Sequence, residues 1–270
     1  MSYQSDAAYR IETVSTKRGL TTPVRVYGHG PIDVLYLHGA GGLLPVEATL
    51  DALVAAELCV AAPLWPGYSE HEDEHLLEDM LDFALHGWDV VNELGLEKPS
   101  IVGHSMGGMI AAEMAAIAPQ SVDRLGLLCP AGMWIDEHPI PDLFSMLPFE
   151  MAEVLFADPV AGEKMLAAGM DFSDDKALTD FMVARARQLG MAGKILFPVP
   201  NRRLSKRAYR IYNPTILVWG NQDRLIPPVY AGAFEAAIAN TSTVFVDGAG
   251  HMLPHEQPAA VAEALVNHLG

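Results

Sequence analysis

Short segments that are apolar at every position recur along this chain of 270 residues, and most are separated by segments with helical spacing. Strands of this kind, rather than strands with alternating polarity, are typical of a parallel sheet buried on both faces. The predicted strands are 34–37, 58–62, 100–102, 125–129, 216–219 and 243–246, and the predicted helices are 45–56, 76–94, 109–118, 229–239 and 258–269. This alternation predicts an α/β fold with a mostly parallel, doubly wound sheet.

Two regions depart from the alternation. Residues 11–27 contain two extended segments around a turn at 17–20, which predicts an antiparallel hairpin at the sheet edge. Between about Trp134 and Tyr209, Met, Leu, Phe and Ala recur at helical spacing without a strand. We therefore expect a core made of residues 1–133 and 210–270, interrupted by a helical cap over 134–209.

The pentapeptide Gly103-His104-Ser105-Met106-Gly107 stands between a predicted strand and a predicted helix. Small residues on both sides of a serine relieve crowding at a strained strand-to-helix turn, which pushes the hydroxyl outward. The pattern alone is a weak signal, but its position between strand and helix is what a nucleophile elbow requires. Ser105 is the candidate nucleophile.

A serine hydroxyl needs a base within hydrogen-bond reach and an acid that orients the base. Asp223 follows the predicted strand 216–219, and His251 follows the predicted strand 243–246. A turn-capping carboxylate and a surface loop histidine are the alternative interpretations of these two residues. We predict that Ser105, Asp223 and His251 form a catalytic triad.

The tetrahedral intermediate of acyl transfer also needs donors for its oxyanion. The segment HGAGG at 38–42 follows the predicted strand 34–37, so the backbone N–H groups of Ala40 and Met106 are the candidate oxyanion hole. A phosphate-binding loop is the alternative for this segment, but no Lys-Ser/Thr follows it and its spacing is not G-x-G-x-x-G.

The motifs HGAGG, GHSMGG, GNQDRLIP and GAGHMLPHEQP, in this order, resemble those of the α/β-hydrolase-fold superfamily, in its capped serine esterase and lipase-like branch. The resemblance covers Ile32 to about Met133 and Pro214 to Gly270. It implies the triad order Ser, Asp, His and a hydrolase that needs neither a cofactor nor a metal. The first hypothesis is a carboxylic ester hydrolase acting on a small to medium, largely apolar small-molecule substrate.

Two other functions stay open. Capped relatives also cleave carbon–carbon bonds in vinylogous diketones, the meta-cleavage products, and Met106-Gly107-Gly108 and Asp223-Arg224 resemble that group. Those enzymes usually carry Asn at the position of His104. Some members of the superfamily are ligand receptors or adhesion domains rather than enzymes, usually after the loss of triad residues.

The segment His71-Glu72-Asp73-Glu74-His75 matches the zinc pattern H-E-x-x-H. At 100° per residue, however, His71, His75 and Glu78 fall opposite an apolar stripe of the predicted helix, made of Leu77, Met80, Leu81, Ala84 and Trp88. We expect the histidines to face solvent and to hold no metal.

A basic segment runs from Arg202 to Arg210 and holds five of the 17 cationic residues. Its two interpretations are a solvated helix paired with nearby carboxylates and a receptor for a substrate carboxylate. The predicted cap is rich in apolar side chains, some of which should roof Ser105: Met133, Trp134, Phe144, Met146, Phe149, Phe156, Met182 and Phe197.

The formal net charge of −17 disfavours nucleic acid and anionic membranes as partners. Cys59 and Cys129 both lie in strand-like segments, which is typical of buried thiols in a reducing compartment. The N-terminal segment has no basic start followed by an apolar stretch, and the sequence predicts a cytoplasmic protein. A homodimer stays open.

Overall fold

The computed structural model of the protein describes residues 9–70, 74–166, 174–197 and 203–270. In this part of the chain an eight-stranded sheet has the order β1-β2-β4-β3-β5-β6-β7-β8, and every pair from β4 to β8 is parallel. The strands are β1 (Tyr9–Ser15), β2 (Thr21–Tyr27), β3 (Val34–Leu37), β4 (Val60–Pro63), β5 (Ser100–His104), β6 (Leu125–Leu128), β7 (Thr215–Gly220) and β8 (Thr241–Val246). The predicted doubly wound sheet is confirmed, including the antiparallel hairpin β1-β2 at its edge.

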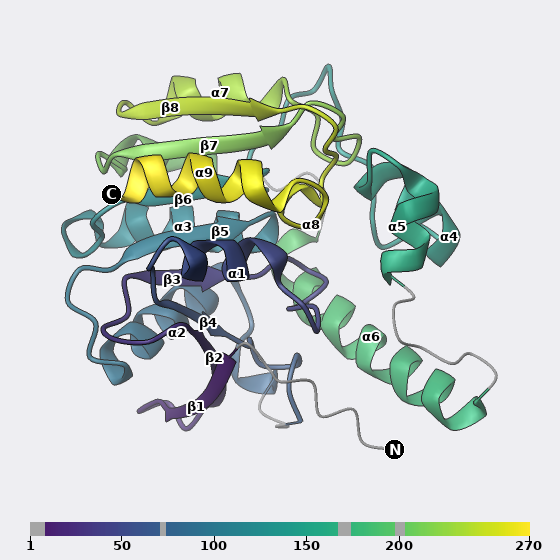
Figure 1. Ribbon diagram of the computed structural model, residues 1–270, viewed down its shortest axis with the longest axis horizontal. Helices are drawn as coiled ribbons and strands as arrows, with labels where there is room; N and C mark the ends of the chain where they lie inside the picture. The colour runs from purple at the N-terminus through teal and green to yellow at the C-terminus, as the bar shows by residue number, and fades with distance from the viewer. Residues whose placement is uncertain (1–8, 71–73, 167–173, 198–202) are drawn as a thin grey trace.

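Helices cover both faces of the sheet, as Figure 1 shows. One face carries α1 (Ala48–Ala55), α8 (Leu253–Glu256) and α9 (Pro258–Leu269). The other carries α2 (Met80–Glu93), α3 (Met106–Ile117) and α7 (Tyr230–Ala237). The central strands β3 to β6 are buried at every position, which explains their uniformly apolar sequences.

Three helices are inserted between β6 and β7, and they project from one end of the sheet (Figure 1). They are α4 (Pro148–Leu155), α5 (Pro159–Leu166) and α6 (Asp175–Leu196). Four short 3-10 turns complete the described part: η1 (Glu74–Leu76), η2 (Pro119–Ser121), η3 (Leu204–Lys206) and η4 (Ala208–Arg210). The insertion was expected from the sequence, and its exact limits at 134 and 209 stay a prediction.

The helix predicted over 76–94 begins later than expected. The Asp79 side chain accepts hydrogen bonds from the backbone N–H groups of Leu81 and Asp82, so α2 begins at Met80 and the residues before it form a separate 3-10 turn. The prediction that Leu81 faces the core is wrong, because its side chain is 54% exposed. Phe83 is buried on that helix instead.

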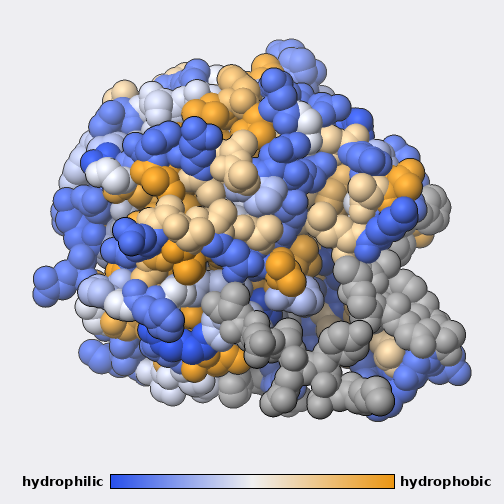
Figure 2. Space-filling model, viewed as in Figure 1, coloured by the Kyte–Doolittle hydropathy of each residue, from blue (hydrophilic) through white to orange (hydrophobic). Residues whose placement is uncertain are grey.

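On the face shown in Figure 2, hydrophobic residues are interspersed with hydrophilic ones. No helix in the described residues is both long enough and apolar enough to cross a membrane.

Candidate active site

Ser105 occupies a sharp turn between β5 and α3. Its φ of 54° and ψ of −114° lie in a region that non-glycine residues seldom adopt. A Cβ on Gly107 would lie 2.0 Å from the carbonyl oxygen of Leu37, and a Cβ on Gly103 would lie 2.3 Å from that of Gly107. Only glycine fits at these two positions, so the small-residue pattern is the physical condition for the turn.

The three predicted triad residues lie in one chain of hydrogen bonds. His251 Nε2 is 2.8 Å from Ser105 Oγ, and His251 Nδ1 is 2.8 Å from Asp223 Oδ2. Because an ionised carboxylate can only accept, Nδ1 carries the proton and Nε2 accepts from the serine hydroxyl. All three residues are buried. The arrangement suits proton transfer from the hydroxyl to the imidazole.

The parallel pairing of β7 and β8 brings the predicted acid and the predicted base together. Gly220 and Val246 are register partners at the ends of these strands, and Asp223 and His251 lie in the loops that follow. Asp223 is also the turn-capping carboxylate of the alternative interpretation, because its Oδ1 accepts from the N–H groups of Leu225 and Ile226. The two roles use different oxygens, so the turn holds the carboxylate that faces His251.

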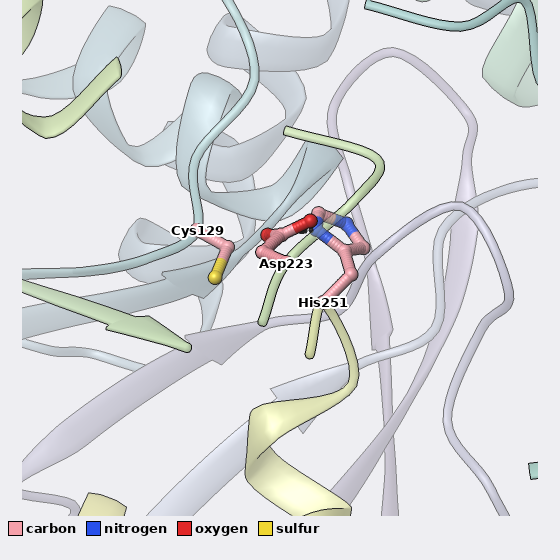
Figure 3. Close-up of side chains that lie close together, drawn as sticks. All are labelled: Cys129, Asp223 and His251. Atoms are coloured by element: carbon pink, nitrogen blue, oxygen red, sulfur yellow. Dashed lines mark hydrogen bonds and ion pairs between the residues drawn. The ribbon is translucent and has the colours of Figure 1, made fainter. Parts of the chain in front are cut away.

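The buried thiol of Cys129 lies beside the carboxylate, on the side away from the imidazole (Figure 3). Cys129 follows β6 and has a φ of +40°, so the sulfur is held there by a strained backbone. Burial, followed by the nearby Asp223 charge, raises the pKa of the thiol well above its usual range. Cys129 therefore remains a neutral thiol next to the acid.

Cys129, Asp223 and His251 offer ligand atoms within 4.8 Å of one another, which is a spacing that a metal ion could use. A thiol with a raised pKa is a poor metal ligand, because metals bind the thiolate. The His251 nitrogen nearest Asp223 also carries the proton of their hydrogen bond. The donor set fits a proton relay better than a metal centre.

The zinc-like HEDEH segment is only partly visible. His71, Glu72 and Asp73 lie outside the described residues, while His75 is exposed in the turn η1. The prediction that His75 faces solvent is confirmed.

The predicted oxyanion donors lie next to the serine. A Cβ on Gly39 would lie 3.4 Å from Ser105 Cβ, so the loop that carries Ala40 packs directly against the elbow. Met106 is the first residue of α3, where an N–H has no acceptor within the helix. Within the described residues, neither the Ala40 N–H nor the Met106 N–H donates to a protein acceptor. Both remain predicted donors to a bound oxyanion.

A pocket opens at Ser105 and is walled almost entirely by apolar side chains. The described residues that line it are Ala40, Ser105, Met109, Ala131, Gly132, Met133, Trp134, Ile140, Pro141, Leu143, Phe144, Leu196, Leu225 and Ile226. Of the described lining residues, Trp134 and Ser105 carry polar side-chain atoms. The Trp134 indole N–H donates to Asp136, so the Ser105 hydroxyl is the polar side-chain group offered to the pocket. Such a pocket accepts an uncharged, hydrocarbon-rich group.

The inserted helices are hydrogen-bonded to loops of the core, in one case directly after His251. The backbone N–H of Met252 donates to the carbonyl of Leu155 in α4 over 2.9 Å, one residue after His251. Lys194 in α6 donates to the carbonyl of Leu77 over 2.7 Å. Leu196 and Phe144, both from the predicted cap, line the pocket. Of the other predicted roof residues, Phe156 is buried, whereas Met182 and Phe197 are largely exposed; the side chain of Phe149 lies outside the described set.

The basic segment forms two 3-10 turns rather than one helix; Arg202 lies outside the described residues. Arg207 pairs with the buried carboxylate of Glu113 in α3, and Arg210 donates to the carbonyl of Ala116 over 2.7 Å. The described part of the segment thus attaches the end of the insertion to α3. It supplies no side chain to the pocket at Ser105.

The contacts of two residues near the site were not predicted from the sequence. The His104 ring lies with Nε2 2.8 Å from the backbone oxygen of His251, and burial keeps the pKa of this histidine well below its usual range. The His104 ring is thus neutral and donates to the His251 carbonyl. The sequence signal is its place in the elbow motif, directly before Ser105.

The second is Arg185 in α6. Its Nη1 lies 3.6 Å from the position that a Cβ on Gly41 would take, next to the Ala40 loop. Among the described residues no carboxylate lies within ion-pair distance of it, and its Nη2 lies 4.0 Å from the Met151 sulfur. Burial lowers the pKa of this arginine. The sequence offered no motif for it.

The family assignment rests on the match to known sequences. The sequence profile described as "Alpha/beta hydrolase family" matches residues 34–264. The chain belongs to the alpha/beta hydrolase family. As a member of this family it is a serine hydrolase, and the superfamily resemblance seen in the motifs is confirmed.

Curated relatives of this family member differ in name. It is 30% identical to the dihydrolipoyllysine-residue acetyltransferase component of the acetoin cleaving system of Cupriavidus necator, over 98% of this chain and 70% of that protein. It is 27% identical to the 2-hydroxy-6-oxononadienedioate/2-hydroxy-6-oxononatrienedioate hydrolase of Cupriavidus pinatubonensis, over 98% and 92%.

Solved structures share the fold of this alpha/beta hydrolase at low identity. A membrane phospholipase A described as a bacterial virulence factor superposes with a TM-score of 0.77 at 20% identity, over 97% of this chain and 86% of the other. The 2-hydroxy-6-oxo-6-phenylhexa-2,4-dienoate hydrolase from Rhodococcus sp. strain RHA1 gives 0.74 at 21%, over 96% and 99%.

Proposed function

We propose that this hydrolase cleaves a carboxylic ester of a small to medium, largely apolar substrate through an acyl-enzyme on Ser105. The observation that carries the proposal is that the apolar pocket begins at the hydroxyl that faces His251 Nε2. An uncharged acyl group fits this pocket, and its carbonyl carbon would lie at the serine.

In the proposed mechanism Ser105 Oγ attacks the ester carbonyl while His251 Nε2 takes the hydroxyl proton. Asp223 holds the imidazole in the required tautomer and stabilises the imidazolium. The N–H groups of Ala40 and Met106 bind the oxyanion of the tetrahedral intermediate, and an oxyanion donor of this kind is typically worth about 10²- to 10³-fold in rate.

Collapse of the intermediate breaks the carbon–oxygen bond, and the imidazolium gives its proton to the leaving alcohol. A water then attacks the acyl-enzyme with His251 again as the base, which releases the carboxylic acid and restores Ser105. The predicted cap over the site excludes bulk water and selects substrates by shape.

A second candidate is hydrolysis of a carbon–carbon bond in a vinylogous diketone, and Arg185 favours it. A relative is named as a hydrolase of a dienedioate, a substrate with two carboxylate groups. A guanidinium without a carboxylate partner among the described residues, beside the Gly41 backbone, suits such a group. Against this candidate, the His104 ring replaces the Asn usual in that group and is used to hold His251.

One substrate panel separates the two candidates. p-Nitrophenyl esters of increasing acyl length and a carboxylate-bearing dienol diketone are compared with wild type and Arg185→Gln. Ester hydrolysis predicts higher kcat/KM for the esters and little effect of Arg185→Gln on them. If the diketone is the better substrate and Arg185→Gln raises its KM at least tenfold, the second candidate replaces the first.

A matched specificity test uses the pocket. Leu196→Ala should enlarge it at the α6 side, so kcat/KM should rise for longer acyl chains relative to acetate. Val183→Ala, at an exposed position of the same helix, is the control. An unchanged chain-length preference in Leu196→Ala would show that the acyl group lies elsewhere.

A further inference from the structure

Tyr68 lies between the oxyanion loop and the longest inserted helix. Its hydroxyl is 3.0 Å from the backbone oxygen of Ala40 and 3.1 Å from the backbone oxygen of Gln188 in α6. Ala40 and Gln188 are far apart in the sequence, and this hydroxyl contacts both. Neither the triad nor the proposed mechanism uses it.

The Tyr68 side chain is buried and packed against another ring. Tyr68 is 9% exposed, and its ring packs on the ring of His38 with centroids 4.6 Å apart. His38 accepts from the Trp65 N–H through Nε2 and donates from Nδ1 to the carbonyl of Gly39, the residue before Ala40. The Tyr68 ring therefore rests on a side chain that is itself bonded to the oxyanion loop.

The turn that carries Tyr68 also packs closely against α6. A Cβ on Gly67 would lie 2.3 Å from Cγ of Met191, so the turn that carries Tyr68 is packed against α6 at a position where only glycine fits. Met191 is buried one turn beyond Gln188. A shift of α6 would therefore act directly on the turn that carries Tyr68.

The contact has one donor proton and two acceptors, because the Tyr68 hydroxyl carries a single proton and faces two carbonyl oxygens. Burial raises the pKa of Tyr68, so the phenol stays protonated and can always donate. Without this proton, two carbonyl dipoles would face one another across a buried space. The hydroxyl thus donates its one proton to the Ala40 carbonyl or to the Gln188 carbonyl, or shares it between them, and in this way links the oxyanion loop to α6.

We propose that Tyr68 is a positioning residue that links the position of α6 to the conformation of the oxyanion loop. The Ala40 N–H then points at the reacting carbonyl only when α6 is packed against the turn that carries Tyr68. This inference rests on the proposed function, in which Ala40 is an oxyanion donor. It assigns to the predicted cap a role in forming the catalytic site as well as in selecting the substrate.

The test is a double-mutant cycle on an ester that wild type hydrolyses and Ser105→Ala does not. Tyr68→Phe removes only the hydroxyl and should lower kcat/KM about three- to tenfold, the value of one hydrogen bond. KM should change less than twofold. The affinity for a trifluoromethyl ketone, which forms a tetrahedral oxyanion on the serine, should fall by the same factor as kcat/KM. Tyr209→Phe, at a tyrosine that is 75% exposed, is the matched control and should change none of these values.

Met191→Ala weakens the packing of α6 against the turn that carries Tyr68 and leaves the Tyr68 hydroxyl unchanged. It should lower kcat/KM severalfold in wild type but less than twofold in the Tyr68→Phe background, since coupling through one residue makes the effects non-additive. Circular dichroism and thermal unfolding verify that each variant is folded at the assay temperature. Multiplicative effects, or trifluoromethyl ketone affinity unchanged by Tyr68→Phe, would overturn the proposal. If no ester can be found whose hydrolysis requires Ser105, the proposed function is overturned instead.

Discussion

The ring of His104 donates from Nε2 to the backbone oxygen of His251 over 2.8 Å, so the residue before the predicted nucleophile holds the backbone of the predicted base. The two rings lie with centroids 5.2 Å apart. The turn that carries Ser105 is therefore joined to His251 twice, once through Ser105 Oγ and once through the buried His104 ring.

Replacing His104 should weaken catalysis more than binding. His104→Ala leaves a buried carbonyl without its donor, which typically costs about 1–3 kcal/mol, and frees the His251 backbone. We expect a roughly tenfold lower kcat with little change in KM, and partial recovery in His104→Gln, whose amide can still donate. Steady-state kinetics on an ester test this, with exposed His29→Ala as the control. Equal loss in His104→Ala and His104→Gln would contradict a donor role.

Ser105→Ala should leave the fold intact and lower turnover by several orders of magnitude. A triad acts as one unit, and its removal leaves only binding and oxyanion stabilisation. Turnover is compared with thermal unfolding of the same preparation. A residual rate within tenfold of wild type would mean that another group is the nucleophile.

Glu47 predicts a pH dependence of stability. It is buried, accepts from the Leu44 N–H over 2.6 Å and lies 3.7 Å from His255 Nε2. Burial raises the pKa of Glu47 from 4.5 to about 8 and lowers that of His255 from 6.5 to about 4, so near pH 7 the carboxyl is mostly protonated and the imidazole neutral. Because the folded state then binds a proton that the unfolded state releases, this carboxyl's contribution to stability falls as pH rises from about 4.5 through 8.

Glu47→Gln cannot ionise but keeps an acceptor for the Leu44 N–H. The wild-type Tm should therefore fall more steeply than the Tm of Glu47→Gln between pH 6 and pH 9. Glu93→Gln, at an exposed position of α2, is the control and should follow wild type. Parallel Tm curves for wild type and Glu47→Gln would show that the Glu47 carboxyl is not protonated in the folded state.

Chelation should not affect activity. His75 is exposed and the Cys129 thiol beside the triad stays protonated, so neither group suits a bound metal. We expect unchanged kcat/KM after dialysis against EDTA, measured with metal analysis of the same sample. A stoichiometric metal ion whose removal abolishes activity and whose return restores it would contradict this expectation.

The sequence was sufficient for features that depend on neighbours in the chain. The positions of the strands to within two residues, the elbow glycines and the order of Ser105, Asp223 and His251 follow from local motifs and from the rule that parallel strands end at one edge of a sheet. The start of α2 is also a local feature: Asp79 caps the helix, although the apolar stripe in the sequence continues back to Leu77.

What the sequence did not predict depends on contacts between distant segments. Tyr68 contacts a helix 120 residues later, and Arg207 pairs with Glu113 across 94 residues. Neither pair has a spacing or composition that marks it, since each partner is ordinary in its own segment. The basic segment was predicted as a solvated helix paired with nearby carboxylates or as a receptor for a substrate carboxylate. Glu113 could not be recognised as the partner of Arg207, because this buried carboxylate lies among apolar residues in the sequence of α3.

The position of α4–α6 between β6 and β7 also fixes the order in which the parts of the site are synthesised. A ribosome makes Ser105 and the inserted helices before it makes Asp223 and His251, and domains fold from the N-terminus as they emerge. The nascent chain thus carries Ser105 without the predicted base until β7 and β8 have been made. Synthesis of the inserted helices is complete before the predicted triad can assemble.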